Sequence, residues 1–246
     1  MIRWTYAFID RPTARVGLAT EFWEAVTGTR ASAMWGDRGE FTTLLPEGAT
    51  GADACLVVQA VGGAGGAHPD LAVEDVGEFT ARATLLGAVV ENLGPELTVL
   101  RSPGGQPFCV VPWHGQKVRP PVVGGPGRPE SRLDQLCLDV APAAFDAEVA
   151  FWTALTGWDG TPADHREFHA LRPREDLPVH LLLQRLDEAR PASAHLDIAC
   201  PDLAAGRAWH ERCGAVPVRE GPTWTVMRDP AGGVYCLTRR DPVTGR

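Results

Sequence analysis

The stretch AHLDIACPDLAAGRAWHERCGAVPVREGPTWTVMRDPAGGVYCL, from Ala194 to Leu237, decides how this chain is organised because its outline occurs twice. An earlier stretch, AHPDLAVEDVGEFTARATLLGAVVENLGPELTVLRSPGGQPFCV, runs from Ala67 to Val110, 127 positions upstream. In this alignment His68 corresponds to His195, and Cys109 corresponds to Cys236. A repeat of this length predicts a duplicated architecture, so any chemistry should be sought near the repeated strands.

The bulk composition bounds the class of protein. A chain of 246 residues suits two domains, and 44% hydrophobic with 22% charged residues is ordinary for a globular protein. The 31 acidic residues outnumber the 23 basic ones and no basic run occurs, so we expect no nucleic-acid partner.

Six cysteines occur without a C-x-x-C pair, which argues against a zinc ribbon or a thioredoxin-like motif. Most of them lie in apolar runs, where a free thiol behaves as a small hydrophobic group. The first residues have a strand pattern and no signal-peptide pattern, and no apolar run reaches the ~20 residues of a membrane span. We therefore expect a cytoplasmic protein with unpaired thiols and no membrane partner.

The chain predicts one order of elements four times: strand, helix, and three further strands. In the first copy, Trp4–Ile9 is the first strand and Thr13–Thr27 is the helix, which Gly28 ends. The three strands that follow are predicted at Ala33–Trp35, Phe41–Leu45 and Cys55–Val61.

The order restarts at Gly66, and the second half of the chain repeats the scheme. This predicts an α+β fold with domains at 1–115 and 132–246, joined by a Pro/Gly-rich linker at 116–131. The motif Phe22-Trp23-x-Ala25-x-Thr27-Gly28 recurs as Phe151-Trp152-x-Ala154-x-Thr156-Gly157, and its aromatic residues are interpreted as core. Asp229 and Ser102 are interpreted as turn formers that precede proline.

Four motifs carry a resemblance to a known superfamily: Phe151–Gly157 (FWTALTG), Leu181–Arg185 (LLLQR), Ala194–Asp197 (AHLD) and Arg228–Cys236 (RDPAGGVYC). The chain resembles the vicinal-oxygen-chelate superfamily of glyoxalase I, bleomycin-resistance proteins and extradiol dioxygenases, and most of all its glyoxalase-like branch. The resemblance implies two tandem domains, each made of paired βαβββ units whose curved sheets surround a cup.

The same resemblance implies positions for metal ligands in the second domain. Gln135, Gln184, His195 and Cys236 occupy or lie near them, so one divalent ion (zinc, nickel or manganese) is a candidate cofactor there. The sequence departs from the pattern at Cys236, which stands where the family places a glutamate. Oxygen-rich sites for hard cations do not favour thiolate ligands, so this departure weakens the metal hypothesis.

Strand alternation adds candidates for contact with an organic ligand. Leu136, Leu138 and Val140 should face the helix, which leaves Gln135, Cys137 and Asp139 for the cup. The full set of ligand-contact candidates is His68, Trp158, Trp224, Cys137 and Asp139. For His195 a functional and a structural role are equally favoured, whereas His68 is interpreted as structural, hydrogen-bonded to Asp70 on the same strand face.

Two functions follow as hypotheses. The first is a protein that binds a small organic molecule, with an aromatic one as a candidate, in the cup of one or both domains. The alternative is a metal-dependent lyase or isomerase of the glyoxalase type in the C-terminal cup, for which no catalytic base is assigned. Because each half already holds two units, one chain can complete both cups: a monomer suffices, and a homodimer stays open.

Overall fold

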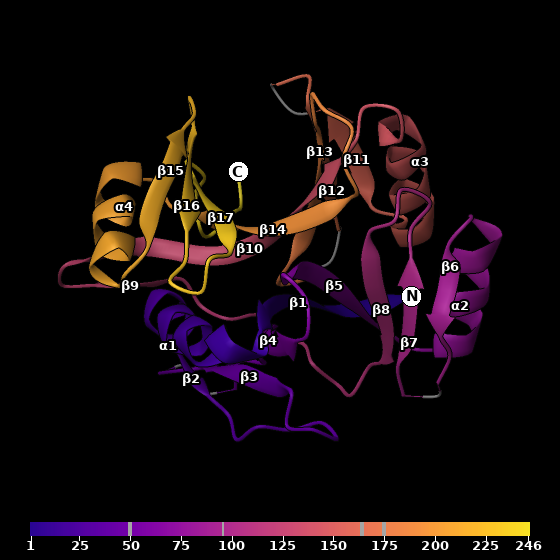
Figure 1. Cartoon of the computed structure of the whole chain (residues 1–246), viewed down its shortest axis with the longest axis horizontal. Coiled ribbons are helices and arrows are strands. Elements are labelled where there is room, and N and C mark those ends of the chain that lie inside the picture. Colours follow the sequence, from indigo (N-terminus) through magenta and orange to yellow (C-terminus); the bar gives the residue numbers. More distant parts are fainter. Residues whose placement is uncertain (49–50, 95, 163–164, 174–175) are drawn as a thin grey trace. The chain divides into compact units, whose positions relative to one another are not determined.

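Four modules with the predicted order of elements follow one another along the chain. The computed structural model describes residues 1–48, 51–94, 96–162, 165–173 and 176–246 (Figure 1). The first module comprises β1 (Ile2–Pro12), the 3-10 turn η1 (Thr13–Arg15), α1 (Val16–Thr27), β2 (Thr29–Ala31), β3 (Phe41–Pro46) and β4 (Leu56–Val61). The second comprises β5 (Gly66–Val73), α2 (Val76–Leu85), β6 (Val89–Asn92), β7 (Thr98–Arg101) and β8 (Pro107–Pro112).

The second half of the chain repeats this order. The third module comprises β9 (Val123–Gly125), β10 (Arg128–Val140), α3 (Phe145–Thr156), β11 (Asp159–Pro162), β12 (Phe168–Arg172) and β13 (His180–Arg185). The fourth comprises β14 (Ser193–Ala199), α4 (Leu203–Arg212), β15 (Val216–Glu220), β16 (Trp224–Arg228) and β17 (Val234–Thr238). The α+β fold predicted from the duplication is confirmed.

Each half of the chain contributes one sheet. Among the described residues, the strand order is β2-β3-β4-β1-β5-β8-β7-β6 in the first sheet and β11-β12-β13-β10-β14-β17-β16-β15 in the second. Within each sheet the pairs β5–β8 and β14–β17 are parallel, whereas the neighbouring pairs β7–β8 and β16–β17 are antiparallel. Helix α2 lies alongside β6–β8, and α4 lies alongside β15–β17 (Figure 1).

The two compact units of the chain do not coincide with its two sheets. Unit 1 comprises residues 1–7, 68–117 and 136–194, and therefore holds nearly all of the second and third modules. Unit 2 comprises residues 8–67, 118–135 and 195–246, and holds most of the first and fourth modules. Each compact unit thus combines one module from each half, while the domain borders at 1–115 and 132–246 stay a prediction.

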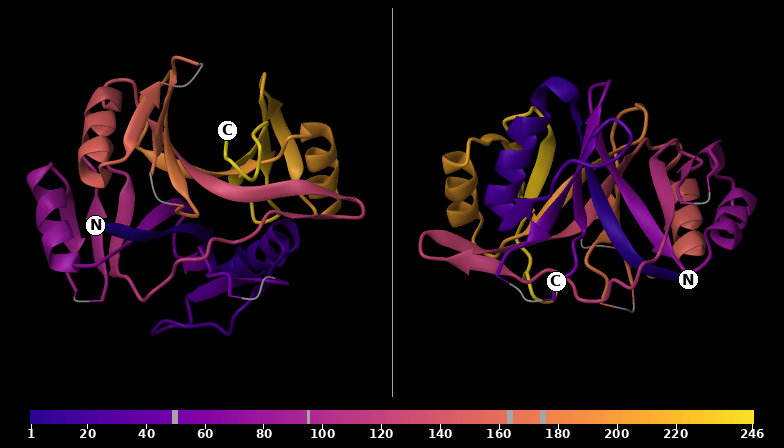
Figure 2. Two further views of the ribbon diagram at one scale, coloured as in Figure 1. Left: turned by 180° about the vertical axis from the view of Figure 1, so that it is seen from behind. Right: turned by 90° about the horizontal axis from the view of Figure 1, so that it is seen from below.

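Part of the predicted linker is ordered as a β-hairpin. Strand β9 pairs with the start of β10, with Arg128 opposite Gly125 (Figure 2). Gly127 has φ of +74°, a conformation that glycine adopts without strain, so the Pro/Gly-rich composition builds a tight turn here. Arg128 then donates a hydrogen bond of 2.8 Å to the carbonyl of Val26 in α1.

The predicted strand at Ala33–Trp35 is wrong. Strand β2 lies earlier, at Thr29–Ala31, and of the predicted residues only Trp35 pairs, in an isolated bridge with Phe41. The Trp35 ring stacks on Phe41 with centroids 4.5 Å apart, and the two residues also exchange both backbone hydrogen bonds. A single bridge and an aromatic contact therefore hold this segment.

The repeated Phe-Trp motif forms core in both units, as predicted. In unit 2, Trp23 of α1 has no exposed surface and packs edge-to-face on Tyr235 of β17, with centroids 5.2 Å apart. In unit 1, Trp152 of α3 packs in the same way on Phe108 of β8, at 5.0 Å. A helix from one half of the chain therefore packs on the closing strand of the other half in each unit.

A buried carboxylate accepts the indole N–H in each unit. Trp23 Nε1 donates to Asp229 Oδ2 at 3.2 Å, and Arg11 forms an ion pair of 2.6 Å with the same oxygen. The Asp229 Oδ1 atom accepts the backbone N–H of Gly233, so the turn former predicted at this position also carries a buried ion pair. Sequence interpretation of Asp229 as a turn residue alone missed this role, since Arg11 lies 218 positions away.

In unit 1 the carboxylate that accepts the indole N–H lies on helix α3. Glu148, one turn before Trp152 in α3, accepts the indole N–H at 2.9 Å and the backbone N–H of Gly104 at 2.6 Å. At the position that corresponds to Asp229, this unit has Ser102, whose hydroxyl accepts the backbone N–H of Gln106. In unit 2 the acceptor for the buried indole N–H therefore comes from the turn before the closing strand. In unit 1 it comes from the helix that carries the tryptophan.

Removal of the Asp229 charge should destabilise the protein strongly. The substitution Asp229→Asn leaves the Arg11 guanidinium buried without its counter-charge, a change that typically costs about 3–5 kcal/mol. We expect the urea midpoint of unfolding to fall accordingly. The matched control is Glu220→Gln, which breaks the exposed ion pair with Arg207 and should leave the midpoint unchanged. Equal midpoints for the two variants would contradict the structural role of Asp229.

The buried His210 should make stability depend on pH. Its Nδ1 lies 2.8 Å from the Tyr235 hydroxyl, and burial first, then the nearby Arg128 charge, lowers its pKa from 6.5 to about 3. The folded state disfavours protonation of His210. The stability that the neutral imidazole contributes is therefore present above about pH 6.5 and is lost as the pH falls from there toward 3. The thermal midpoint of wild type should therefore drop between pH 7.5 and 5, and His210→Gln should flatten the drop. The exposed His114→Gln is the control and should retain the wild-type slope.

Candidate functional site

The repeated His-x-Asp motif of the second module lies against a cysteine on the neighbouring strand. His68 and Asp70 lie two residues apart on β5, so their side chains share a face. Strand β8 runs parallel to β5 and places Cys109 opposite Asp70. One atom from each of the three side chains lies within 4.8 Å of the other two, and His68 Nε2 is 3.4 Å from Asp70 Oδ1.

The environment of this cluster keeps the thiol neutral. All three residues are buried, and burial raises the pKa of Cys109 to about 12, helped by the Asp70 charge and opposed by His68. Asp70 Oδ1 has no solvent contact and accepts no hydrogen bond from the described residues. The His68 imidazole nitrogen, 3.4 Å away, is the ion-pair partner of this oxygen when the ring is protonated.

The fourth module repeats the arrangement along its own strands. His195 Nε2 lies 3.5 Å from Asp197 Oδ1 on β14, and Cys236 on the parallel strand β17 lies opposite Asp197. Asp197 and Cys236 are buried, whereas His195 is partly exposed. The strand register is therefore the same in the two stretches, with the cysteine opposite the aspartate in each.

The residues predicted as metal ligands are distributed over both units. Gln135 lies on β10 and is buried in unit 2, which also contains His195 and Cys236. Gln184 lies on β13 in unit 1, where its Oε1 atom is 3.8 Å from the Cys137 thiol. Within unit 2, the structure thus brings His195 and Cys236 onto adjacent strands.

Two of the candidates for ligand contact, Cys137 and Asp139, lie in a polar group in unit 1. The Asp139 carboxylate accepts hydrogen bonds from Arg190 at 3.1 Å and from the Ser193 hydroxyl at 3.3 Å. Cys137 lies two residues before Asp139 on β10, next to Gln184. Arg190 and Ser193 were not predicted, because Arg190 lies in a loop, Ser193 begins a strand, and neither belongs to a motif. The positive charge of Arg190, complementary to that of Asp139, is the signal in the sequence that could have identified it.

The two tryptophans differ in exposure. Trp158 follows α3 in unit 1 and is 5% exposed, with its backbone N–H donating to the Thr156 hydroxyl at 3.2 Å. Trp224 begins β16 in unit 2 and is partly exposed. The two side chains lie in different compact units, where Trp158 is buried and Trp224 is partly exposed.

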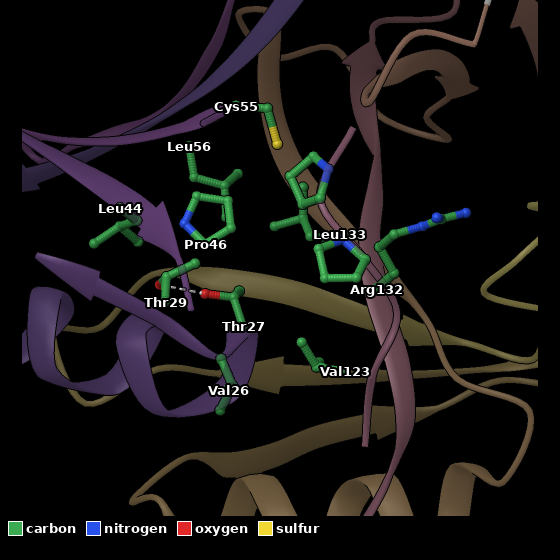
Figure 3. A pocket seen from close by; sticks show the side chains of 12 residues that line it. Val26, Thr27, Thr29, Leu44, Pro46, Cys55, Leu56, Val123, Arg132 and Leu133 are labelled. Carbon is green, nitrogen blue, oxygen red and sulfur yellow. Dashed lines mark hydrogen bonds between the residues drawn. The ribbon is translucent and has the colours of Figure 1, made fainter. Parts of the chain in front are cut away.

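A small pocket occurs in unit 2, away from these residues. It is lined mostly by apolar side chains, among them Val26, Leu44, Leu56 and Val123, with the stem of Arg132 at one side (Figure 3). Its volume of about 20 Å³ holds about one water molecule, far less than an organic ligand needs. We therefore assign no ligand to it.

The donor chemistry allows a metal but restricts which one. Imidazole, carboxylate and thiol side chains together are ligands that Zn²⁺ accepts, whereas Mn²⁺ prefers oxygen ligands. The His68, Asp70 and Cys109 side chains, which lie within 4.8 Å of one another, are ligands of the first kind. No helix in the described part of the chain is long and apolar enough to cross a membrane.

Several solved structures have a fold similar to that of this chain. A manganese(II)-bound glyoxalase from Novosphingobium aromaticivorans is 16% identical with a TM-score of 0.68, over 100% of this chain and 86% of that one. The 2,3-dioxygenase LapB from Pseudomonas sp. KL28 is 14% identical with a TM-score of 0.63, over 96% and 92%. The 2,2',3-trihydroxybiphenyl 1,2-dioxygenase from Sphingomonas wittichii strain RW1 is 13% identical with a TM-score of 0.61, over 100% and 95%.

At these identities the likeness concerns the fold, which is that of the vicinal-oxygen-chelate superfamily. Comparison with curated protein sequences gives no match. The family model of the glyoxalase-like domain, in contrast, matches twice, at residues 7–111 and 135–238. The chain therefore belongs to the glyoxalase-like domain family and carries two copies of that domain.

Proposed function

We propose that the chain binds a small organic molecule in the cup of one or both glyoxalase-like repeats. The observation that carries this proposal is the polar group on β10 and its neighbours in unit 1. Asp139, Arg190 and Ser193 form connected hydrogen bonds there, on a strand whose alternate residues Leu136 and Leu138 are fully buried. A few oriented polar groups set among apolar side chains are typical of ligand sites.

The chemistry of these side chains suggests how the ligand would be held. The Arg190 side chain is 42% exposed, so part of its guanidinium can donate to a carboxylate or hydroxyl of the ligand while Asp139 fixes its position. Cys137 on β10 and Gln184 on the neighbouring strand β13 add neutral polar groups. Trp158 and His68 are further proposed contacts in unit 1, and Trp224 is a proposed contact in unit 2. Stacking on a planar ring would be the contribution of each tryptophan.

Tryptophan fluorescence offers the test of binding, because the chain has eight tryptophans. A panel of aromatic antibiotics and aromatic carboxylic acids should contain compounds that quench the emission with saturation. Asp139→Asn should weaken their affinity about tenfold, since it releases Arg190 from a charge-assisted hydrogen bond.

The control for this test is Asp146→Asn, a substitution of an exposed aspartate on α3. It should bind the same compounds with wild-type affinity. If no compound of the panel quenches the folded protein, or if both variants bind equally well, the proposed site is wrong.

A second candidate function is a metal-dependent lyase or isomerase of the glyoxalase type in the C-terminal repeat. It is favoured by the His195–Asp197 pair, which lies on β14 beside the strand that carries Cys236. In this proposal the sequence candidates of unit 2, Gln135, His195 and Cys236, would hold one divalent ion of zinc, nickel or manganese. Such an ion would act as a Lewis acid on two neighbouring oxygens of the substrate.

Metal binding by this second site is tested by titration of the purified, metal-free protein with Zn²⁺, Ni²⁺ and Mn²⁺ by calorimetry. His195→Ala should remove one binding event, because His195 supplies the imidazole nitrogen that all three ions accept. His165→Ala, in a segment outside the proposed site, is the control and should leave the isotherm unchanged. Identical isotherms for wild type and His195→Ala would contradict the metal-dependent function.

A further inference from the structure

We propose that Arg15 and Arg228 form a surface site in unit 2 for a phosphate group, carried either by inorganic phosphate or by a small phosphorylated compound. The two arginines come from opposite halves of the chain and meet at the turn that precedes β17. The site lies outside the residues proposed above for the organic ligand and for the metal ion, and it depends on neither proposal.

The turn holds both guanidinium groups at its carbonyl oxygens. Arg15, the residue directly before α1, donates from Nη1 to the carbonyl of Ala231 at 3.3 Å. Arg228, the last residue of β16, donates from Nη1 to the carbonyl of Gly232 at 3.3 Å. Because these carbonyls belong to consecutive residues, the two cations are neighbours on one turn. An arginine has five N–H donors, so each side chain retains donors for an anion.

Neither arginine is neutralised by the protein. Both side chains are exposed, and neither forms an ion pair with a carboxylate in the described part of the chain. Asp229 in the same turn is already paired with the buried Arg11 at 2.6 Å. Two neighbouring cations repel each other, so a bound anion would be stabilising at this turn. A Cβ atom at Gly17 would meet no atom within 4 Å, so the surface beside Arg15 is open.

The corresponding turn of unit 1 carries its own counter-charge. Arg101 occupies the position of Arg228 and likewise donates to a turn carbonyl, that of Gly105, but it also forms an ion pair with Glu91. Glu91 lies at the register shift of the edge strand β6, and Val218 lies at the same place in the edge strand β15. Val218 therefore stands where unit 1 has the carboxylate that neutralises its arginine.

The helix next to the turn shows the same difference. Alignment of the Phe-Trp motifs places Gly17 and Ala19 of α1 at the positions of Asp146 and Glu148 of α3. The first turn of α3 thus has two carboxylates, whereas that of α1 has none and follows Arg15. Unit 1 supplies its own negative charges at this place, while unit 2 leaves two positive charges there in a chain of net charge −8.

Two arginines suit a phosphate group better than a single carboxylate. A phosphate monoester carries about −1.5 to −2 charges at pH 7, so one such group offsets both guanidinium charges. Its oxygens also match the paired N–H donors of an arginine. Because both side chains are exposed, we expect affinity in the millimolar range that falls as sodium chloride is added.

Phosphorus NMR of inorganic phosphate and of phenyl phosphate, titrated with the full-length protein, tests the site. Both compounds should show a saturable shift, and Arg15→Gln and Arg228→Gln should each weaken binding about tenfold, since each removes a charge-assisted contact. Val218→Glu should weaken it to a similar degree without removing an arginine, because it gives Arg228 the partner that Arg101 has. The matched control is Arg101→Gln, which should retain wild-type affinity.

The two compounds also distinguish the sources of the phosphate group. Tighter binding of phenyl phosphate supports a phosphorylated compound as the occupant, and equal binding supports free phosphate. Near-ultraviolet circular dichroism verifies that each variant is folded. The proposal is overturned if neither compound binds saturably to the folded protein, if acetate binds as tightly as phosphate, or if Arg15→Gln, Arg228→Gln or Val218→Glu retains wild-type affinity. An equal loss in Arg101→Gln and Arg228→Gln overturns it as well.

Discussion

Both compact units depend on a buried carboxylate that accepts the indole N–H of the tryptophan in the repeated Phe-Trp motif. The indole N–H of Trp23 and of Trp152 is fully buried, so each needs an acceptor within the core. Asp229 serves the first and Glu148 the second. Asp229 also accepts from Arg11, and Glu148 also accepts from the turn at Gly104, so each carboxylate ties a helix of one half of the chain to a turn of the other.

This arrangement fixes the strands that carry the candidate chemistry. The turns held by Asp229 and Glu148 lie directly before β17 and β8, the closing strands that contain Cys236 and Cys109. Each closing strand pairs in parallel with the strand that carries a His-x-Asp motif, which sets the cysteine opposite the aspartate. The packing that stabilises the units thus also determines which polar side chains meet.

Much of the fold could be predicted from the sequence, because the duplication repeats each element with its own start and stop signals. The helix ends at Gly28 and Gly157, and the core role of Trp23 and Trp152, follow from local pattern alone. The strand at Ala33–Trp35 could not be predicted correctly, since Thr29–Ala31 form the ladder with β3 and only Trp35 pairs farther along, in an isolated bridge with Phe41. Glycines and prolines at 123–128 indicated a linker, although the same residues also favour the hairpin turn that forms.

The candidate site was only partly accessible to sequence reasoning. Alignment of the repeats identified His68, His195, Cys109 and Cys236, and alternation identified Cys137 and Asp139 on one strand. The partners of these residues depend on contacts between distant segments: Arg190 reaches Asp139 from a loop without a motif. Likewise, the lack of a hydrogen bond at Asp70 Oδ1 is a property of the packed structure, which composition and spacing do not encode.

Separate production of residues 1–115 and 116–246 tests the central claim most directly. If each compact unit needs a helix and a closing strand from different halves, neither fragment alone should give the near-ultraviolet circular dichroism and cooperative unfolding of the full chain. Mixing the two fragments should restore both. Two fragments that each fold cooperatively on their own, with no change on mixing, would contradict the account.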